Sequence, residues 1–267
     1  MAANQPAIGI FDSGVGGLTV LRRIAQRLPN ESLIYLGDTA RVPYGTKSAD
    51  TVIRYARSCA AILLEEGVKL LIVACNTASA FALETLQADL DIPVIGVIEP
   101  GAVSALKTTR NRRIGVIGTA GTIGSGAYPD AIRAHAPDVE VFVQSCPLFV
   151  PLAEEGWTSG EAPRIIARTY LEPMIGQGVD TLVLGCTHYP LLHDAIAEVM
   201  GESVALVDSA EATACAVEAI VDGTGIEANA EEPPRRRFLV TDAPENFARI
   251  GRQFLGCNIG PVEWVDF

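Results

Sequence analysis

Short runs of apolar residues recur along the chain, and each run ends at or near a glycine, an aspartate or a threonine. These runs lie at residues 7–11, 33–36, 70–74, 94–98, 114–117, 139–143, 181–184 and 204–207. They are rich in Val, Ile and Leu and do not alternate with polar residues, which predicts strands buried on both faces of a parallel sheet. Amphipathic stretches between them predict helices at residues 17–28, 48–66, 78–90, 164–177 and 210–221.

Strands that alternate with helices predict an α/β fold with doubly wound parallel sheets, whose ligand sites lie at the carboxyl ends of the strands. Two of the strand-end segments occur in similar pairs. IGIFDSGVGG at 8–17 resembles IGVIGTAGT at 114–122, and LIVACNT at 71–77 resembles LVLGCTH at 182–188. This internal repeat predicts two similar α/β lobes.

We expect the first lobe to comprise residues 1–98 plus 209–267 and the second lobe to comprise residues 99–208. The boundaries then fall near Glu99–Gly101 and Asp208–Ser209. Helix 210–221, a polar linker at 223–234 and the apolar run 237–241 are expected to return the tail to the first lobe. Small-molecule pockets concentrate at interfaces of this kind, so we expect the active site in the cleft between the lobes.

Charge and composition exclude several classes of protein. The 32 acidic and 20 basic residues give a net charge of −12, which argues against nucleic acid as a partner. Residues 1–14 lack the regions of a signal peptide, and no uncharged apolar stretch reaches the roughly 18 residues of a membrane span, so we expect no membrane association. None of the cysteines forms a C-x-x-C pair, and reduced thiols fit a cytoplasmic protein.

Two cysteines, Cys75 and Cys186, each follow an apolar strand and precede hydroxyl, amide or imidazole side chains. Where a strand ends and a helix begins, free backbone N–H groups and the helix dipole lower the pKa of a thiol from about 8.5. We therefore expect two reactive thiols. The remaining cysteines are expected to be buried structural residues: Cys59, Cys146, Cys215 and Cys257.

The polar neighbours of these two cysteines are candidate ligand-binding residues. Asn76–Thr77 and Thr187–His188 supply hydrogen-bond donors for an anion, of which a carboxylate is the natural example. Helix capping is the alternative function of such residues. Asp12–Ser13, after the first strand, adds a carboxylate that could orient a thiol or accept a hydrogen bond from an ammonium group.

Gly14–Gly17 follows a strand and opens a helix, and Asp38 ends the next strand, which suggests a dinucleotide-binding loop as an alternative. Thr19 occupies the third glycine position of that motif, and nicotinamide or flavin chemistry does not need two strand-end cysteines. We therefore expect no cofactor and no metal. The glycines are expected instead to let a small ligand approach the backbone closely.

Two thiols presented from two similar lobes across one cleft predict a reaction with mirror-like halves. Stereoinversion is such a reaction, because one base removes a proton from one face of a carbon while a second acid delivers a proton to the other face. One cysteine must then be a thiolate while its partner is a thiol, and the two exchange these states in the reverse direction.

Six strings of residues closely resemble the glutamate racemases of the aspartate/glutamate racemase family. In order along the chain they are IGIFDSGVGGLTVLR, YLGDTARVPYGTKS, VACNTASA, IGVIGTAGTI, CPLFVPLAEEG and VLGCTHYPLL, and they extend from residue 8 to residue 192. The resemblance implies a cofactor-independent enzyme with two α/β lobes that interconverts L- and D-glutamate for bacterial peptidoglycan synthesis. It also implies a homodimer.

The resemblance further implies roles for individual residues. Cys75 and Cys186 match the two catalytic acid/bases, Asp12 matches the acidic helper of the first thiol, and His188 matches the helper of the second. Positions expected to bind the substrate are Asp12, Ser13, Tyr44, Gly45, Asn76, Thr77, Thr119, Thr187 and His188. Two further candidates are Pro43, for which an ordinary turn is the alternative, and Glu154, which matches a family acid.

Two other functions remain open at this point. A relative on the same scaffold could racemise aspartate or decarboxylate its substrate, and an acidic regulatory protein could bind an amino acid without turning it over. Some members of the family carry an N-terminal extension through which a peptidoglycan precursor activates them. The first strand is expected a few residues from the start, so we do not expect that activation here. Inhibition of DNA gyrase, known in some members, is undecided by the sequence.

Overall fold

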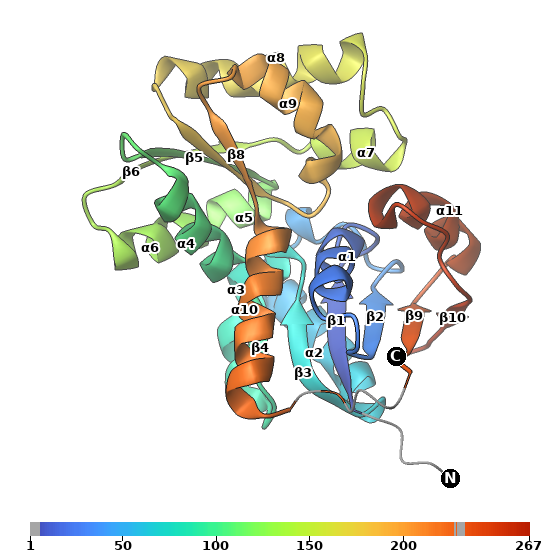
Figure 1. Cartoon of the computed structure of the whole chain (residues 1–267). Helices are drawn as coiled ribbons and strands as arrows, with labels where there is room; N and C mark the ends of the chain where they lie inside the picture. The colour runs from blue at the N-terminus through green and yellow to red at the C-terminus, as the bar shows by residue number, and fades with distance from the viewer. Residues whose placement is uncertain (1–5, 227, 229–232) are drawn as a thin grey trace.

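The computed structural model describes residues 6–226, 228 and 233–267, which contain two parallel β-sheets (Figure 1). The larger sheet has the strand order β10-β9-β2-β1-β3-β4. Its strands are β1 (Ala7–Asp12), β2 (Leu33–Gly37), β3 (Val68–Val73), β4 (Val94–Gly96), β9 (Arg236–Val240) and β10 (Val262–Trp264). Every neighbouring pair is parallel.

The smaller sheet has the order β6-β5-β7-β8, and its neighbouring strands are again all parallel. Its strands are β5 (Arg113–Gly118), β6 (Glu140–Ser145), β7 (Thr181–Gly185) and β8 (Ala205–Asp208). The fold class predicted from the sequence, an α/β protein with two parallel sheets, is therefore confirmed. In Figure 1 the two sheets lie one above the other with the carboxyl ends of β1 and β3 directed toward the smaller sheet.

Helices cover both faces of each sheet. Apolar clusters place α1 (Leu18–Arg27), α10 (Ser209–Thr224) and α11 (Pro244–Leu255) on one face of the larger sheet, and α2 (Ala49–Glu65) and α3 (Asn76–Asp89) on the other. The smaller sheet is covered by α4 (Ile98–Thr108) and α6 (Ala127–His135) on one face, and by α8 (Glu161–Gly176) and α9 (His193–Met200) on the other. The short helices are α5 (Ala120–Gly124), α7 (Phe149–Glu154) and the 3-10 helices η1 (Tyr44–Thr46) and η2 (Tyr189–Leu192).

Three expected strands differ from the sequence-based prediction. The runs at 139–143 and 204–207 were expected to be buried on both faces, but β6 and β8 are edge strands, and Val143 and Ala205 are exposed. An edge strand has a neighbour on one side only, so apolar composition alone does not show whether it is covered. The run at 94–98 is also shorter than expected, because Ile98 already begins α4.

The tail of the chain returns to the larger sheet. Helix α10 packs against α1, and β9 pairs with β2 so that Phe238 lies opposite Tyr35. Asp208 ends β8 and Ser209 begins α10, whereas Glu99–Gly101 lies in the first turn of α4, which packs on the smaller sheet. The expected linker at 223–234 includes residues 227 and 229–232, which lie outside the described residues, as do residues 1–5.

Within the part of the chain that the structure describes, no helix has the length and apolar character required to cross a membrane.

Candidate active site

The two candidate cysteines lie at the carboxyl ends of the central strands of the two sheets. Cys75 follows β3 and is the N-cap residue of α3, as expected. Cys186 directly follows β7, but the chain then turns through η2 before α9 begins at His193. The prediction of a helix N-terminus at Cys186 is therefore wrong. Both thiols are nevertheless buried, at 6% exposure each, and both line one shared cavity.

This cavity collects most of the residues expected to bind substrate. Its lining includes Ser13, Pro43, Tyr44, Gly45, Asn76, Thr77, Thr119, Thr187 and His188, together with both cysteines. The structure adds Val42, Thr122, Val150 and Gly185. Asp12 and Glu154 are not part of the lining, but each contacts a residue that is. The cavity volume is about 30 Å³, which is room for no more than a few water molecules.

The burial of Cys75 disfavours its thiolate. Its Sγ donates a weak hydrogen bond to Ser13 Oγ over 3.7 Å. Burial, together with the nearby Asp12 carboxylate, raises the pKa of the Cys75 thiol to about 12. The expected lowering of this pKa by the helix N-terminus is therefore wrong, because the loss of hydration outweighs the backbone hydrogen bond from Ala78.

Asp12, the last residue of β1, connects the two sheets. It is fully buried, its Oδ2 accepts a hydrogen bond from the Gly14 backbone N–H over 3.0 Å, and its Oδ1 accepts one from Thr187 Oγ1 over 3.4 Å. Burial raises the pKa of this carboxyl group, while the nearby His188 opposes the rise. The carboxylate is therefore held near the Cys75 thiol by residues that follow strands of both sheets.

His188 forms a chain of three groups with Cys186 and Glu154. Its Nδ1 lies 3.8 Å from Cys186 Sγ, and its Nε2 lies 2.9 Å from Glu154 Oε1. Burial alone would lower the pKa of His188, but the hydrogen bonds with Cys186 and Glu154 outweigh it and raise the pKa to about 10. At neutral pH the imidazole is thus protonated, and its Nδ1 lies within reach of the Cys186 thiol. The rings of His188 and Phe254 pack in a T-shaped arrangement, with their centroids 5.2 Å apart.

Asn76 presents an unsatisfied donor at the cavity. Its Oδ1 accepts a hydrogen bond from Tyr128 Oη over 2.7 Å, while its Nδ2 is buried without a partner. A buried donor left unpaired costs free energy, so a ligand oxygen in the cavity would stabilise this side chain. Thr77, Thr119 and Thr122 form a cluster of hydroxyl groups 2.9–3.1 Å apart. Thr119 is also the N-cap residue of α5, so this one side chain both caps a helix and lines the cavity.

The glycines at 14–17 have a different use from the one expected. None of them lines the cavity. A Cβ atom on Gly16 would lie 2.2 Å from Thr187 Oγ1 and 2.5 Å from His188 Nδ1, and one on Gly17 would lie 2.6 Å from Asp12 Cβ. These glycines therefore make room for side chains of the site itself, including two from the other sheet, and not for a ligand.

The four remaining cysteines divide into two classes. Cys59 and Cys146 are buried, as expected of structural residues. Cys215 and Cys257 are exposed, so the expectation of burial is wrong for these two. Cys215 lies on the solvent side of α10, and Cys257 follows the C-cap residue of α11. In residues 6–226, 228 and 233–267, no group of three or more His, Cys, Asp or Glu side chains could hold a metal ion.

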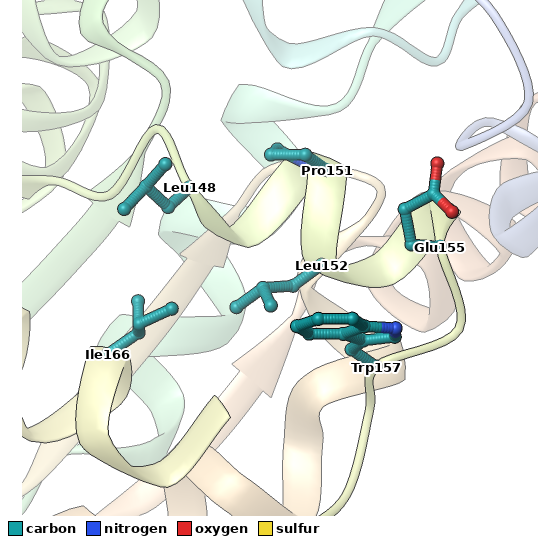
Figure 2. Close-up of a pocket in the computed structure, with 6 residues that line it drawn as sticks. All are labelled: Leu148, Pro151, Leu152, Glu155, Trp157 and Ile166. Carbon is teal, nitrogen blue, oxygen red and sulfur yellow. The ribbon is translucent and has the colours of Figure 1, made fainter. Parts of the chain in front are cut away.

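A second hollow lies on the surface beside α7 and α8, and its lining includes neither of the two candidate thiols. It has a volume of about 190 Å³ and is lined by Leu148, Pro151, Leu152, Glu155, Trp157 and Ile166. Figure 2 shows the apolar side chains around this groove and the Glu155 carboxylate pointing away from them. None of the candidate catalytic or binding residues lines it, and the carboxylate of Glu155, the one ionisable side chain of its lining, points away from the apolar side chains.

Several residues of the site were not predicted from the sequence. Thr122 lies three residues after Thr119, the spacing of a helix cap, and this spacing could have identified it. Tyr128, Val150 and Phe254 reach the site only through tertiary packing.

Comparisons with known proteins agree with this geometry. Residues 8–217 match the family model for Asp/Glu/Hydantoin racemase. A glutamate racemase of Geobacter metallireducens is 58% identical over 97% of this chain and 96% of its own length. The structure of a glutamate racemase isoform from Bacillus anthracis superposes with a TM-score of 0.94 at 41% identity and covers 99% of this chain and 98% of that one.

A glutamate racemase from Francisella tularensis, whose crystal structure is a complex with D-glutamate, superposes with a TM-score of 0.92. It is 38% identical, and the match covers 98% of each chain. The resemblance found in the six sequence strings is thus confirmed over nearly the whole length. The chain therefore belongs to the Asp/Glu/Hydantoin racemase family and, within it, to the glutamate racemases.

Proposed function

We propose that the protein interconverts L-glutamate and D-glutamate by a two-base mechanism without a cofactor, and that the product D-glutamate serves peptidoglycan synthesis. Cys75 and Cys186 are the two bases, one on each side of the substrate α-carbon. The observation that carries this proposal is the shared cavity, into which one buried thiol enters from each sheet. Similarity to glutamate racemases over the full chain supports the choice of substrate.

The surroundings of the two thiols differ in the way that a two-base reaction needs. The raised pKa of about 12 keeps Cys75 protonated, so it can donate a proton. His188, whose Nδ1 lies 3.8 Å from Cys186 Sγ and whose Nε2 is paired with Glu154, is placed to exchange a proton with the second thiol. We assign Cys186 as the base and Cys75 as the acid in one direction, and one turnover reverses these roles.

The remaining lining residues suit the polar groups of an amino acid. The unpaired Nδ2 of Asn76 and the hydroxyl cluster of Thr77, Thr119 and Thr122 offer donors to carboxylate oxygens. The buried Asp12 carboxylate can accept a hydrogen bond from the substrate ammonium group, whose positive charge stabilises the carbanion that forms at the α-carbon.

Substrate entry requires the two lobes to separate, because a cavity of about 30 Å³ is too small for glutamate. We assign the moving bodies to residues 1–98 with 209–267 and to residues 99–208. Gly45, which would clash with Thr119 if it carried a Cβ atom, lies at a close contact between them. Closure after binding excludes water from the carbanion. Small-angle scattering that does not change with glutamate would count against this motion.

The test follows optical activity and loss of the α-hydrogen together when L-glutamate is incubated with the protein in D₂O. Cys75→Ser and Cys186→Ser are each expected to lower kcat by at least about a hundredfold, because a hydroxyl group is a much poorer base than a thiol. Cys215→Ser, which changes an exposed thiol on α10, is the matched control and is expected to behave as the unmodified protein.

Racemisation that survives in both active-site variants would refute the two-thiol mechanism. Faster turnover of aspartate than of glutamate would move the assignment to a related racemase, and ligand binding without any hydrogen exchange would favour a binding protein. The homodimer, the cytoplasmic location and the question of gyrase inhibition stay predictions or open points from the sequence.

A further inference from the structure

The segment from Val42 to Gly45 forms one wall of the cavity, yet the side chain of Tyr44 is anchored elsewhere. Its ring is buried and packs against Tyr55 at 5.6 Å. Its hydroxyl group donates a short hydrogen bond to Asp38 Oδ2, and Asp38 does not line the cavity. Burial, with Cys59 and Asp38 nearby, raises the pKa of Tyr44 well above its ordinary value, so the phenol remains a donor. Contacts outside the cavity therefore fix the position of this wall segment.

Asp38 is the centre of this anchor. It is fully buried and accepts three hydrogen bonds, from Tyr44, from Arg41 Nε over 2.7 Å and from Thr241 Oγ1 over 3.0 Å. A buried carboxylate is tolerated only when it is paired and fully hydrogen-bonded. These partners also leave Asp38 no free oxygen for a ribose, the role that a dinucleotide-binding alternative would give it.

The tail of the chain covers the anchor. The Arg41 guanidinium lies 4.2 Å from the ring centroid of Tyr55 and 3.5 Å from that of Phe267. The backbone N–H of Ala40 donates to Thr241 Oγ1 over 3.0 Å, which ties the segment to the end of β9. The six sequence strings that resemble glutamate racemases end at residue 192, so the resemblance implied no function for the C-terminal tail.

We propose that Asp38 and Arg41 are positioning residues of the substrate site, which hold Tyr44 and so keep the cavity wall in place. The ring of Phe267 stabilises the arrangement by packing on the Arg41 guanidinium. This inference rests on the proposed function, because its measure is the binding of glutamate. Neither residue lines the cavity with Cys75 and Cys186, so loss of the anchor weakens the binding of substrate and transition state alike, and KM rises while kcat changes little.

The experiment measures KM and kcat for L- and D-glutamate, together with the melting temperature, in single variants of the full chain. Asp38→Asn is expected to raise KM about tenfold or more, because the amide presents N–H donors to a site built from donors. Phe267→Ala is expected to raise KM about two- to fivefold through loss of the cation–π contact, and Phe267→Tyr is expected to restore it.

Arg41→Lys keeps the charge but not the planar group, so its KM is expected to exceed that of the unmodified protein. The matched control is Arg57→Ala, which breaks an exposed ion pair between Arg57 on α2 and Asp89 on α3 and does not involve the cavity lining. Its KM and kcat are expected to be unchanged.

A purely structural role would lower the melting temperature and the active fraction without a selective change in KM. Unchanged KM in folded Asp38→Asn and Phe267→Ala proteins would therefore overturn the inference while the racemase assignment stands. If Asp38→Asn does not fold, the comparison of Phe267→Ala with Phe267→Tyr decides, since Phe267 is 53% exposed and its replacement leaves the core intact. An unmodified protein that does not racemise glutamate would overturn the proposed function, and the inference with it.

Discussion

Replacement of Glu154 by Gln tests how the site controls the charge of His188. The rise in the pKa of His188 from 6.5 to about 10 corresponds to roughly 5 kcal/mol in favour of the imidazolium form. Hydrogen bonds with Cys186 and Glu154 both contribute to this rise. With the contribution divided between two partners, loss of the Glu154 charge costs on the order of 2 kcal/mol, and the pKa of His188 falls by about one to two pH units.

The assay is an NMR titration of ring-labelled histidine between pH 5 and pH 11. The chain has three histidines, and the exposed His135 and His193 provide internal references. Because the folded-state pKa of His188 is raised, its contribution to stability is fully present below about pH 6.5 and is lost as the pH rises through about 10. In Glu154→Gln this loss is expected at lower pH, measured as the urea midpoint against pH. Glu155→Gln, a change at the exposed neighbouring carboxylate, is the matched control.

Kinetics provide a second readout. A loss of about 2 kcal/mol is expected to lower kcat about thirtyfold for the enantiomer whose proton passes to Cys186. The two enantiomers of glutamate have equal free energies, so kcat/KM must stay equal in the two directions, and asymmetry can appear only in kcat and KM taken separately. A titration midpoint of His188 that is unchanged in Glu154→Gln, or that moves equally in Glu155→Gln, would refute the reasoning.

Three further predictions follow from contacts in the structure. Gly16→Ala places a Cβ atom 2.2 Å from Thr187 Oγ1, which displaces residues of the site, so kcat is expected to fall about tenfold or more. Gly124→Ala is the control, because the space around its Cβ atom is open, and its kinetics are expected to be normal. Phe149→Ala removes a buried ring that packs on Tyr170 and Tyr189, and urea unfolding is expected to show a loss of about 3–5 kcal/mol, against about 0.5 kcal/mol or less for a substitution of the exposed Trp157. Alkylation followed by mass spectrometry is expected to modify the two exposed thiols first and to spare Cys75 at pH 8, since its pKa is about 12; rapid labelling of Cys75 in the folded protein would contradict this.

The sequence was sufficient for the fold class and for most of the cavity lining. Three reactive side chains lie at or just after the carboxyl ends of apolar strands, namely Asp12, Cys75 and Cys186. In a parallel sheet these ends lie along one edge. The positions of these residues could therefore be predicted from local patterns. The exposure of β6 could not be predicted, because an apolar run has the same composition in a central strand as in an edge strand.

Residues that act through distant partners were beyond the reach of local patterns. Glu154 was expected only from a family resemblance, and its hydrogen bond to His188 depends on how α7 packs beside η2. The same is true of Asp38, whose position at the end of a strand suggested a ribose contact, although its partner Thr241 comes from the end of the chain.

The order of strands and helices, the two strand-end thiols and the family are determined by the sequence itself, because each rests on neighbouring residues. The protonation of Cys75 was decided only by the tertiary structure. A helix N-terminus predicts a lowered pKa for Cys75, yet burial removes water from that thiol and raises the pKa to about 12. Hydration is a property of everything that surrounds a group, so no stretch of sequence around Cys75 contains it.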